Sequence, residues 1–263
     1  MRRCWQSVQI ISLWLVEALG ILCLGGVVRH YRGTPVTSLV VPDGILWLLT
    51  VTVNRLWLRT RIGLRSVLPL NHQFRVNAFP LVIVVFLLSE LYDYHVTHGM
   101  TFMTAPLTGL GGAFVVAVYE ETLFRGILLA KCLYRLRASE PFEVMLAVGQ
   151  SSLLYGVMHL LNLVGQPLST TLLQVVTSLA AGALFAAVYL RTRCLLWPIF
   201  LHMIVDFVSF LLRGIAPVPP TMSIVMVSVL TATVALIVAG FLLRRPEETL
   251  TWQTWNCRKN QTV

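Results

Sequence analysis

The sequence predicts an all-α fold, a polytopic bundle of transmembrane helices. Hydrophobic residues make up 57% of its 263 residues and charged residues only 12%, about half the charged share of a typical soluble domain. Apolar runs of roughly 20 residues recur along the whole chain, and a helix of that length crosses the ~30 Å hydrocarbon core of a bilayer. Because backbone polar groups in lipid must pair within the protein, we expect these runs to be helices.

The apolar runs predict about eight spans in one integral membrane domain, residues 1–263. Their expected ranges are 8–28, 39–58, 76–91, 110–134, 142–164, 170–190, 194–213 and 222–243. A polar tail, residues 246–263, follows the last run, and its indoles Trp252 and Trp255 are suited to the headgroup region.

The positions of Lys and Arg predict that both ends of the chain are cytoplasmic. With the N-terminus inside, the outer loops hold only Arg29, Arg32 and Arg213, and Arg125 lies within a helix. The chain has 20 Lys and Arg residues, and all the others fall in inner segments, as the positive-inside rule requires. The net charge of +9 is therefore a topology signal and not a nucleic-acid surface, and the lipid bilayer is the expected partner. Five scattered cysteines show no disulfide or metal-binding spacing.

Ionisable residues lie inside three of the predicted spans. A charge near the bilayer centre costs about 2.5–3.5 kcal/mol on insertion scales, so such residues indicate either paired structure or function. The segments run from Tyr119 to Gly126, from Tyr155 to Asn162 and from Phe200 to Phe207.

Helical spacing sorts these residues into pairs and one exception. Glu121 and Arg125 are four residues apart, as are His202 and Asp206, so each pair shares a helix face. Glu120 lies about 100° around the helix from Glu121 and has no basic partner in its own turn. We expect it to face another helix.

A structural interpretation competes for each residue alone. A single intramembrane histidine such as His159 is usually a helix–helix hydrogen-bond partner, and Glu121 with Arg125 makes a plausible structural ion pair. Glu17, Glu90, Asp43 and Asp93 have no companion base at helical spacing or lie near interfaces, so we expect structural roles for them. The three segments together favour an active site.

The three segments, in order, resemble the signature of the CAAX protease and bacteriocin-processing family (CPBP, or ABI). That signature is EExxxR, then an aromatic residue four positions before His, then His-xxx-Asn/Asp. The matching residues are Glu120, Glu121, Arg125, Tyr155, His159, His202 and Asp206. The resemblance covers residues 110–213, the expected catalytic core. Tyr155 replaces the usual Phe, and Asp206 stands where the prenyl-protein enzymes have Asn.

The resemblance implies an intramembrane endopeptidase that acts on a peptide or protein in or near the membrane, here expected in a bacterial plasma membrane. It implies that Glu120 and His159 activate a water, while His202 and Asp206 stabilise the oxyanion. Supporting roles fall to Glu121, Arg125, Tyr155 and Asn162. An ionised Asp206 cannot donate to an oxyanion, so it is either protonated or serves to orient His202, and we favour orientation.

Three alternatives remain open at this point. Both histidines with Glu120 or Asp206 could supply a zinc ligand set, although HExxH is absent and we expect no metal. A non-catalytic immunity or scaffold protein of the same fold is the alternative to an enzyme. A transporter is disfavoured, because no pair of Gly/Pro-broken spans occupies corresponding positions in the two halves of the chain.

The depth of His159 in the membrane depends on where the fifth span begins. A fifth span beginning near Leu146 would bring His159 closer in depth to His202.

Overall fold

The computed structural model describes residues 2–30, 37–66, 68–98, 105–138, 140–213 and 219–244, and its regular structure within these ranges is entirely helical. The α-helices are α1 (Arg2–His30), α2 (Thr37–Val53), α3 (Leu70–His98), α4 (Ala105–Glu121), α5 (Leu129–Leu136), α6 (Pro141–Met158), α7 (Leu168–Thr192), α8 (Leu196–Arg213) and α9 (Met222–Leu243). Two π-helices, η1 (Asn54–Leu58) and η2 (Thr122–Leu128), and one 3₁₀ helix, η3 (His159–Val164), extend or join them. The predicted all-α class is confirmed.

Five described segments are long and apolar enough to cross a membrane. They are Trp5–Val27, Leu70–Ser89, Pro141–Val164, Leu168–Thr192 and Met222–Leu243, and Leu196–Leu211 is a shorter apolar helix. This confirms a membrane helix bundle, and each predicted range overlaps a described helix. The count of eight spans and the cytoplasmic orientation stay predictions. The tail 246–263 and the side chains of Glu90 and Asp93 lie outside the described residues.

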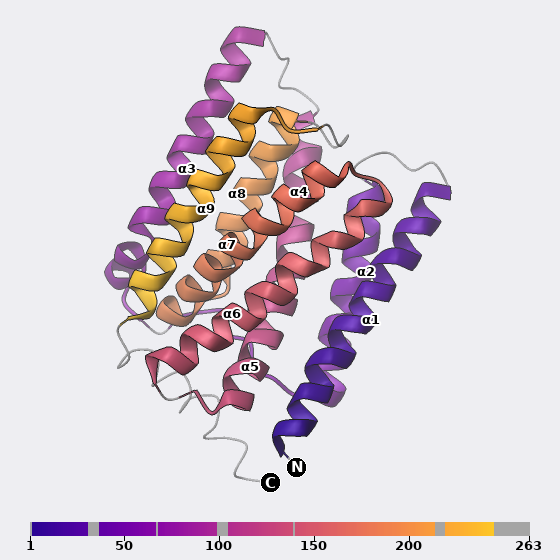
Figure 1. Cartoon of the computed structure of the whole chain (residues 1–263), viewed down its shortest axis with the longest axis vertical. Helices are drawn as coiled ribbons and strands as arrows, with labels where there is room; N and C mark the ends of the chain where they lie inside the picture. The colour runs from indigo at the N-terminus through magenta and orange to yellow at the C-terminus, as the bar shows by residue number, and fades with distance from the viewer. Residues whose placement is uncertain are drawn as a thin grey trace.

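The helices generally extend beyond the apolar runs, because polar residues continue the same helix outside the hydrocarbon. α3, for example, runs from Leu70 to His98, where only 76–91 was expected. α6 begins at Pro141, a residue well suited to a first helical turn, and the Glu140 N–H donates to the Glu143 carboxylate at 3.2 Å. A start near Leu146 is therefore wrong. α6 instead crosses the bundle obliquely (Figure 1).

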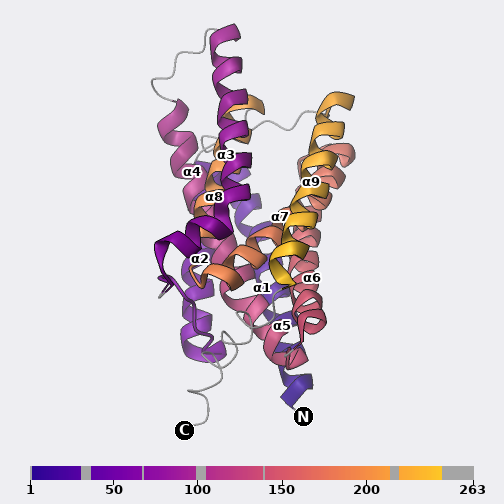
Figure 2. The ribbon, with the colours of Figure 1, turned by 90° about the vertical axis from the view of Figure 1, so that its left-hand side faces the viewer.

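The motif-bearing helices surround α7. α4, η2 and α5 follow one another without a break from Ala105 to Leu136, with α2 and α8 packed against α4 and α6 packed against η2 and α5. α7 contacts α6, α8, α9 and η2. Figures 1 and 2 show these helices side by side in both views, so residues more than 80 positions apart meet in one interior region.

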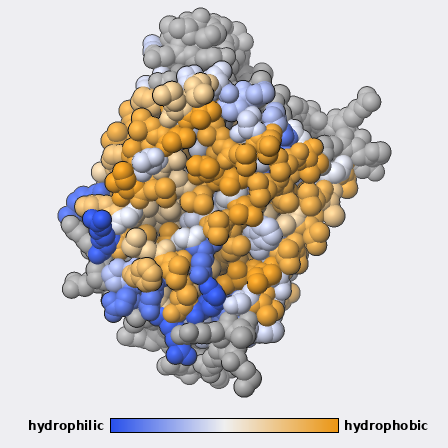
Figure 3. Space-filling view, in the orientation of Figure 1, coloured by the Kyte–Doolittle hydropathy of each residue, from blue (hydrophilic) through white to orange (hydrophobic). Residues whose placement is uncertain are grey.

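The outer surface is mostly apolar. Leu19 on α1, Val82 on α3 and Ile237 on α9 each expose more than 60% of their area. Figure 3 shows a continuous hydrophobic flank with hydrophilic side chains gathered toward its lower end. Soluble monomers rarely expose apolar patches of this extent, whereas a surface that faces lipid requires them.

Arginines directly follow three helices. Arg59, Arg137 and Arg193 follow η1, α5 and α7 with φ values of 51°, 53° and 56°. Glycine usually occupies this left-handed position. A positive side chain there interacts favourably with the negative end of the helix dipole, which partly offsets the strain.

Candidate active site

A π-helix directly follows the two adjacent glutamates. Glu120 and Glu121 end α4, and all seven residues of η2, including Arg125, are buried. Wide π turns are rare and often occur at functional sites; the sequence pattern predicted an ordinary α-helix here. The predicted pair is nevertheless confirmed, since Arg125 Nη1 lies 3.0 Å from Glu121 Oε1 with both side chains inaccessible to solvent.

Aromatic rings surround the Arg125 guanidinium. Its Cζ lies 4.3 Å from the ring centroid of Tyr155 and 5.5 Å from that of Phe185. Cations favour such positions over aromatic faces. Removing one partner of a buried ion pair costs about 3–5 kcal/mol, so this buried pair with its aromatic cover holds η2 firmly.

Glu121 has a second partner that its own motif did not indicate. Its Oε1 also accepts a hydrogen bond from His202 Nδ1 at 2.8 Å. A carboxylate only accepts hydrogen bonds, so this contact places a proton on Nδ1. Glu121 therefore joins η2 to α8 and fixes the orientation of the imidazole, a task that the sequence pattern assigned to Asp206.

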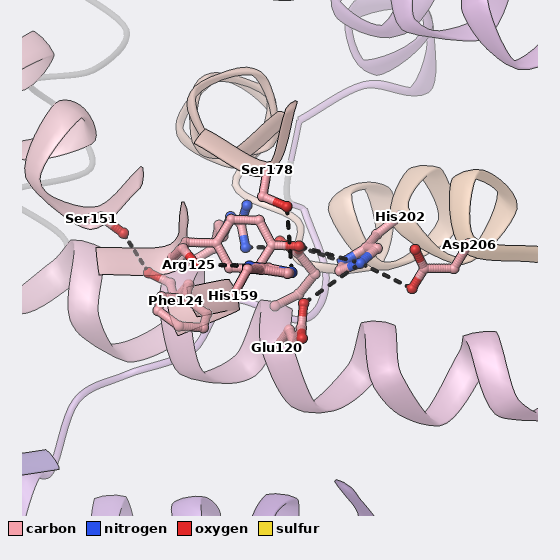
Figure 4. Close-up of polar contacts among 10 residues, drawn as sticks. Glu120, Phe124, Arg125, Ser151, His159, Ser178, His202 and Asp206 are labelled. Carbon is pink, nitrogen blue, oxygen red and sulfur yellow. Dashed lines mark hydrogen bonds and ion pairs between the residues drawn. The ribbon is translucent and has the colours of Figure 1, made fainter. Parts of the chain in front are cut away.

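The other ring nitrogen of His202 faces three oxygen atoms. Nε2 lies 3.2 Å from Asp206 Oδ2, 3.4 Å from the Tyr155 hydroxyl and 3.7 Å from Glu120 Oε2. The first contact is the predicted pair within α8, and the last shows that Glu120 faces another helix, as expected. Figure 4 shows Glu120 and Asp206 on the two sides of this imidazole.

Glu120 and Asp206 are the accessible carboxylates of the site. Their side chains are 20% and 23% exposed, against 0% for Glu121. Within the described residues, Oε2 of Glu120 is buried and accepts no hydrogen bond. This oxygen has the capacity to accept a proton or a hydrogen bond from a bound molecule.

His159 stands at the point where α6 tightens into the 3₁₀ helix η3. Its backbone N–H donates to Gly156 and Val157 rather than to Tyr155, so the Tyr155 carbonyl accepts from the imidazole Nδ1 at 3.0 Å instead. Because a carbonyl only accepts, Nδ1 carries the proton of a neutral ring. The basic nitrogen is then Nε2, which lies 3.3 Å from the Ser178 hydroxyl of α7.

Tyr155 lies between the two imidazoles. Its ring centroid is 4.9 Å from that of His159, and its hydroxyl contacts His202. Asn162, by contrast, donates to the Gln174 side chain at 2.9 Å and so ties η3 to α7; no described contact joins it to the carboxylates. Seven of the eight predicted site residues thus come together, and Asn162 lies apart.

Three contributors had no motif to indicate them. Ser178 contacts His159, Phe185 stacks on His202 at a centroid distance of 5.6 Å, and Asp43 of α2 interacts electrostatically with Glu120 and Asp206. Asp43 was expected near an interface with a structural role. Glu17, also expected to be structural, accepts hydrogen bonds from Thr50 at 2.6 Å and Tyr119 at 3.1 Å.

A glycine on α7 allows the helices to meet at the site. A Cβ on Gly182 would lie 3.1 Å from Tyr155 Cδ1, 3.2 Å from Ser152 Cβ and 3.3 Å from Arg125 Nη2. We therefore expect Gly182→Ala to destabilise the protein by about 1–3 kcal/mol, as overpacking does, in thermal unfolding in detergent. Gly149→Ala on α6 is the control, since nothing lies within 4 Å of its new Cβ. Equal unfolding temperatures for the two variants would contradict this packing.

A family comparison matches the part of the chain that holds these residues. Residues 101–208 match the family model described as type II CAAX prenyl endopeptidase Rce1-like. The matched segment contains all three motifs of the predicted resemblance, which it confirms, and it is less than half of the chain. No curated protein and no solved structure matches the chain.

Proposed function

We propose that this chain, whose residues 101–208 match the family model described as type II CAAX prenyl endopeptidase Rce1-like, is an intramembrane endopeptidase that hydrolyses a peptide bond with an activated water. The family match supports this class of activity. The observation that carries it for this molecule is Oε2 of Glu120, a buried acceptor 3.7 Å from His202 Nε2. The same site contains a second imidazole whose basic nitrogen faces Ser178.

In the proposed reaction, Glu120 and His159 Nε2 accept hydrogen bonds from the attacking water. Glu120 takes a proton as the water oxygen bonds to the scissile carbonyl carbon. It then passes that proton to the amide nitrogen, whose bond to carbon breaks, so that a carboxyl group and an amine are released. A carboxylate with a buried oxygen that accepts no hydrogen bond from the described residues suits this role, because it can receive the proton of a bound water.

Two donors are proposed for the oxyanion. His202 Nε2 and the Tyr155 hydroxyl lie 3.4 Å apart, close enough to donate to one oxygen. Glu121 at Nδ1 keeps the ring oriented with Nε2 toward the site. Asp206 holds the Nε2–H until the carbonyl arrives, which favours the orienting role over a protonated Asp206. Donors fixed in advance in this way stabilise developing charge strongly.

The reaction is proposed to need no metal ion. Nδ1 of His159 and Nδ1 of His202 already have protein partners. Among the described residues, no three His, Cys, Asp or Glu side chains are placed to hold a metal. These contacts support metal-independent hydrolysis.

We expect cleavage to continue after exhaustive chelation in detergent. Peptide release would be followed before and after treatment, with a zinc protease in the same detergent as the positive control for the chelator. Loss of cleavage that added zinc restores would contradict the proposed chemistry.

The proposed substrate is a peptide or protein in or near the membrane of a bacterial cell, and it reaches the site within the bilayer. Nucleic acid is not a proposed partner.

We expect Glu120→Gln, His159→Gln and His202→Gln each to lower cleavage by about 10²- to 10⁴-fold, the usual contribution of acid–base groups. Comparative peptidomics of cells with each variant measures this, and Glu140→Gln, exposed at the start of α6, is the control.

Each variant must also be inserted and folded, which its unfolding temperature shows. The proposal fails if peptides are unchanged while the variants keep the biological phenotype. That result would indicate a non-catalytic immunity or scaffold protein of the same fold.

The role of Asp206 has its own test. If this side chain only accepts a hydrogen bond from His202 Nε2, the amide oxygen of Asn can replace it. We therefore expect Asp206→Asn to keep cleavage within about tenfold of wild type and Asp206→Leu to lose more, since the net worth of one hydrogen bond to a charged group is about 1.5–3 kcal/mol. A loss in Asp206→Asn as large as that in His202→Gln would show that the carboxyl group itself is required.

A further inference from the structure

A basic cavity opens where α7 ends and α3 begins. Its volume is about 360 Å³, and its lining residues are Leu68, Pro69, Asn71, His72, Arg75, Arg191 and Arg193. Three guanidinium groups and one imidazole therefore surround one small space. The sequence assigned these arginines only to topology, and the cavity is separate from the carboxylate–imidazole site.

The cavity lies at the level where apolar helix gives way to polar chain. The span Leu70–Ser89 begins there and the span Leu168–Thr192 ends there. In Figure 1 these helix ends lie on the left and lower-left side of the bundle, where Figure 3 shows hydrophilic side chains gathering beside the hydrophobic flank. Lipid headgroups occupy this level of a bilayer.

Local contacts, most of them to the main chain, order the segments that line the cavity. Arg191 is 5% exposed, and its carbonyl lies 3.3 Å from His72 Nε2. Arg75 Nε donates to the Asn71 carbonyl at 3.3 Å, and the Arg193 N–H donates to the Tyr189 carbonyl at 2.7 Å. The start of the 29-residue helix α3 adds the positive end of its dipole.

We propose that this cavity binds the phosphate group of an anionic phospholipid. Guanidinium groups match phosphate in geometry and charge, and a volume of this size lies in the range of small-ligand sites. Free phosphate shares the chemistry, but the position at the ends of two spans favours a headgroup whose acyl chains lie along the apolar flank. The bound lipid would tie α3 to α7, the helix that carries Ser178 and Gly182.

The test compares two double variants of the full chain. Arg75→Gln with Arg193→Gln removes two cavity arginines, while Arg55→Gln with Arg59→Gln removes two exposed arginines outside the cavity lining. The pairs are matched, since Arg59 and Arg193 both end a helix with positive φ. Native mass spectrometry measures retention of phosphatidylglycerol, with phosphatidylcholine and inorganic phosphate as comparison ligands, and unfolding temperature reports folding.

We expect wild type and the control pair to retain phosphatidylglycerol over phosphatidylcholine. The cavity pair should lose affinity by about tenfold or more, since each basic residue near an anionic lipid contributes about 1 kcal/mol. Equal losses in both folded double variants would overturn the proposal in favour of general surface charge. Absence of selective retention by wild type would also overturn it, as would full displacement of the lipid by millimolar phosphate, which would indicate a free-phosphate site.

Discussion

Arg125, Glu121 and His202 form a buried chain of contacts in which one carboxylate oxygen, Glu121 Oε1, lies 3.0 Å from the guanidinium and 2.8 Å from the imidazole. The rest of the site depends on this chain. It compensates a guanidinium charge that is 1% exposed, fixes one ring nitrogen of His202, and joins η2 to α8 across the bundle. Tyr155 and Phe185 complete it by covering the guanidinium.

This arrangement gives two adjacent glutamates opposite tasks. Glu121 is fully buried and committed to two basic groups, whereas Glu120 retains some exposure and an oxygen with spare capacity to accept. A like division holds for the histidines. His202 has a partner at each ring nitrogen, and His159 keeps a basic nitrogen whose partner among the described residues is a hydroxyl. In the proposed mechanism Glu120 and His159 move the proton, while His202 and Tyr155 receive the negative charge.

Much of this could be predicted from the sequence, because hydropathy and i, i+4 spacing are local properties. They indicated the helix class, the pair of Glu121 with Arg125, the pair of His202 with Asp206, and a Glu120 directed to another helix. Contacts between helices have no local sequence pattern from which they could be predicted. The Glu121–His202 bond, the Ser178 partner of His159 and the approach of Asp43 depend on how α2, α7 and α8 pack. The π-helix η2 could not be predicted either, because its residues have the sequence pattern of an ordinary apolar α-helix.

The unfolding temperatures of Glu120→Gln and Glu121→Gln, measured side by side in one detergent, test the division of labour most directly. The two changes are chemically identical and one residue apart. The account predicts that Glu121→Gln is destabilised by about 3–5 kcal/mol, because it leaves the buried Arg125 charge without its counter-charge, and that Glu120→Gln unfolds at or above the wild-type temperature. Equal destabilisation of the two variants, or a greater loss in Glu120→Gln, would contradict it.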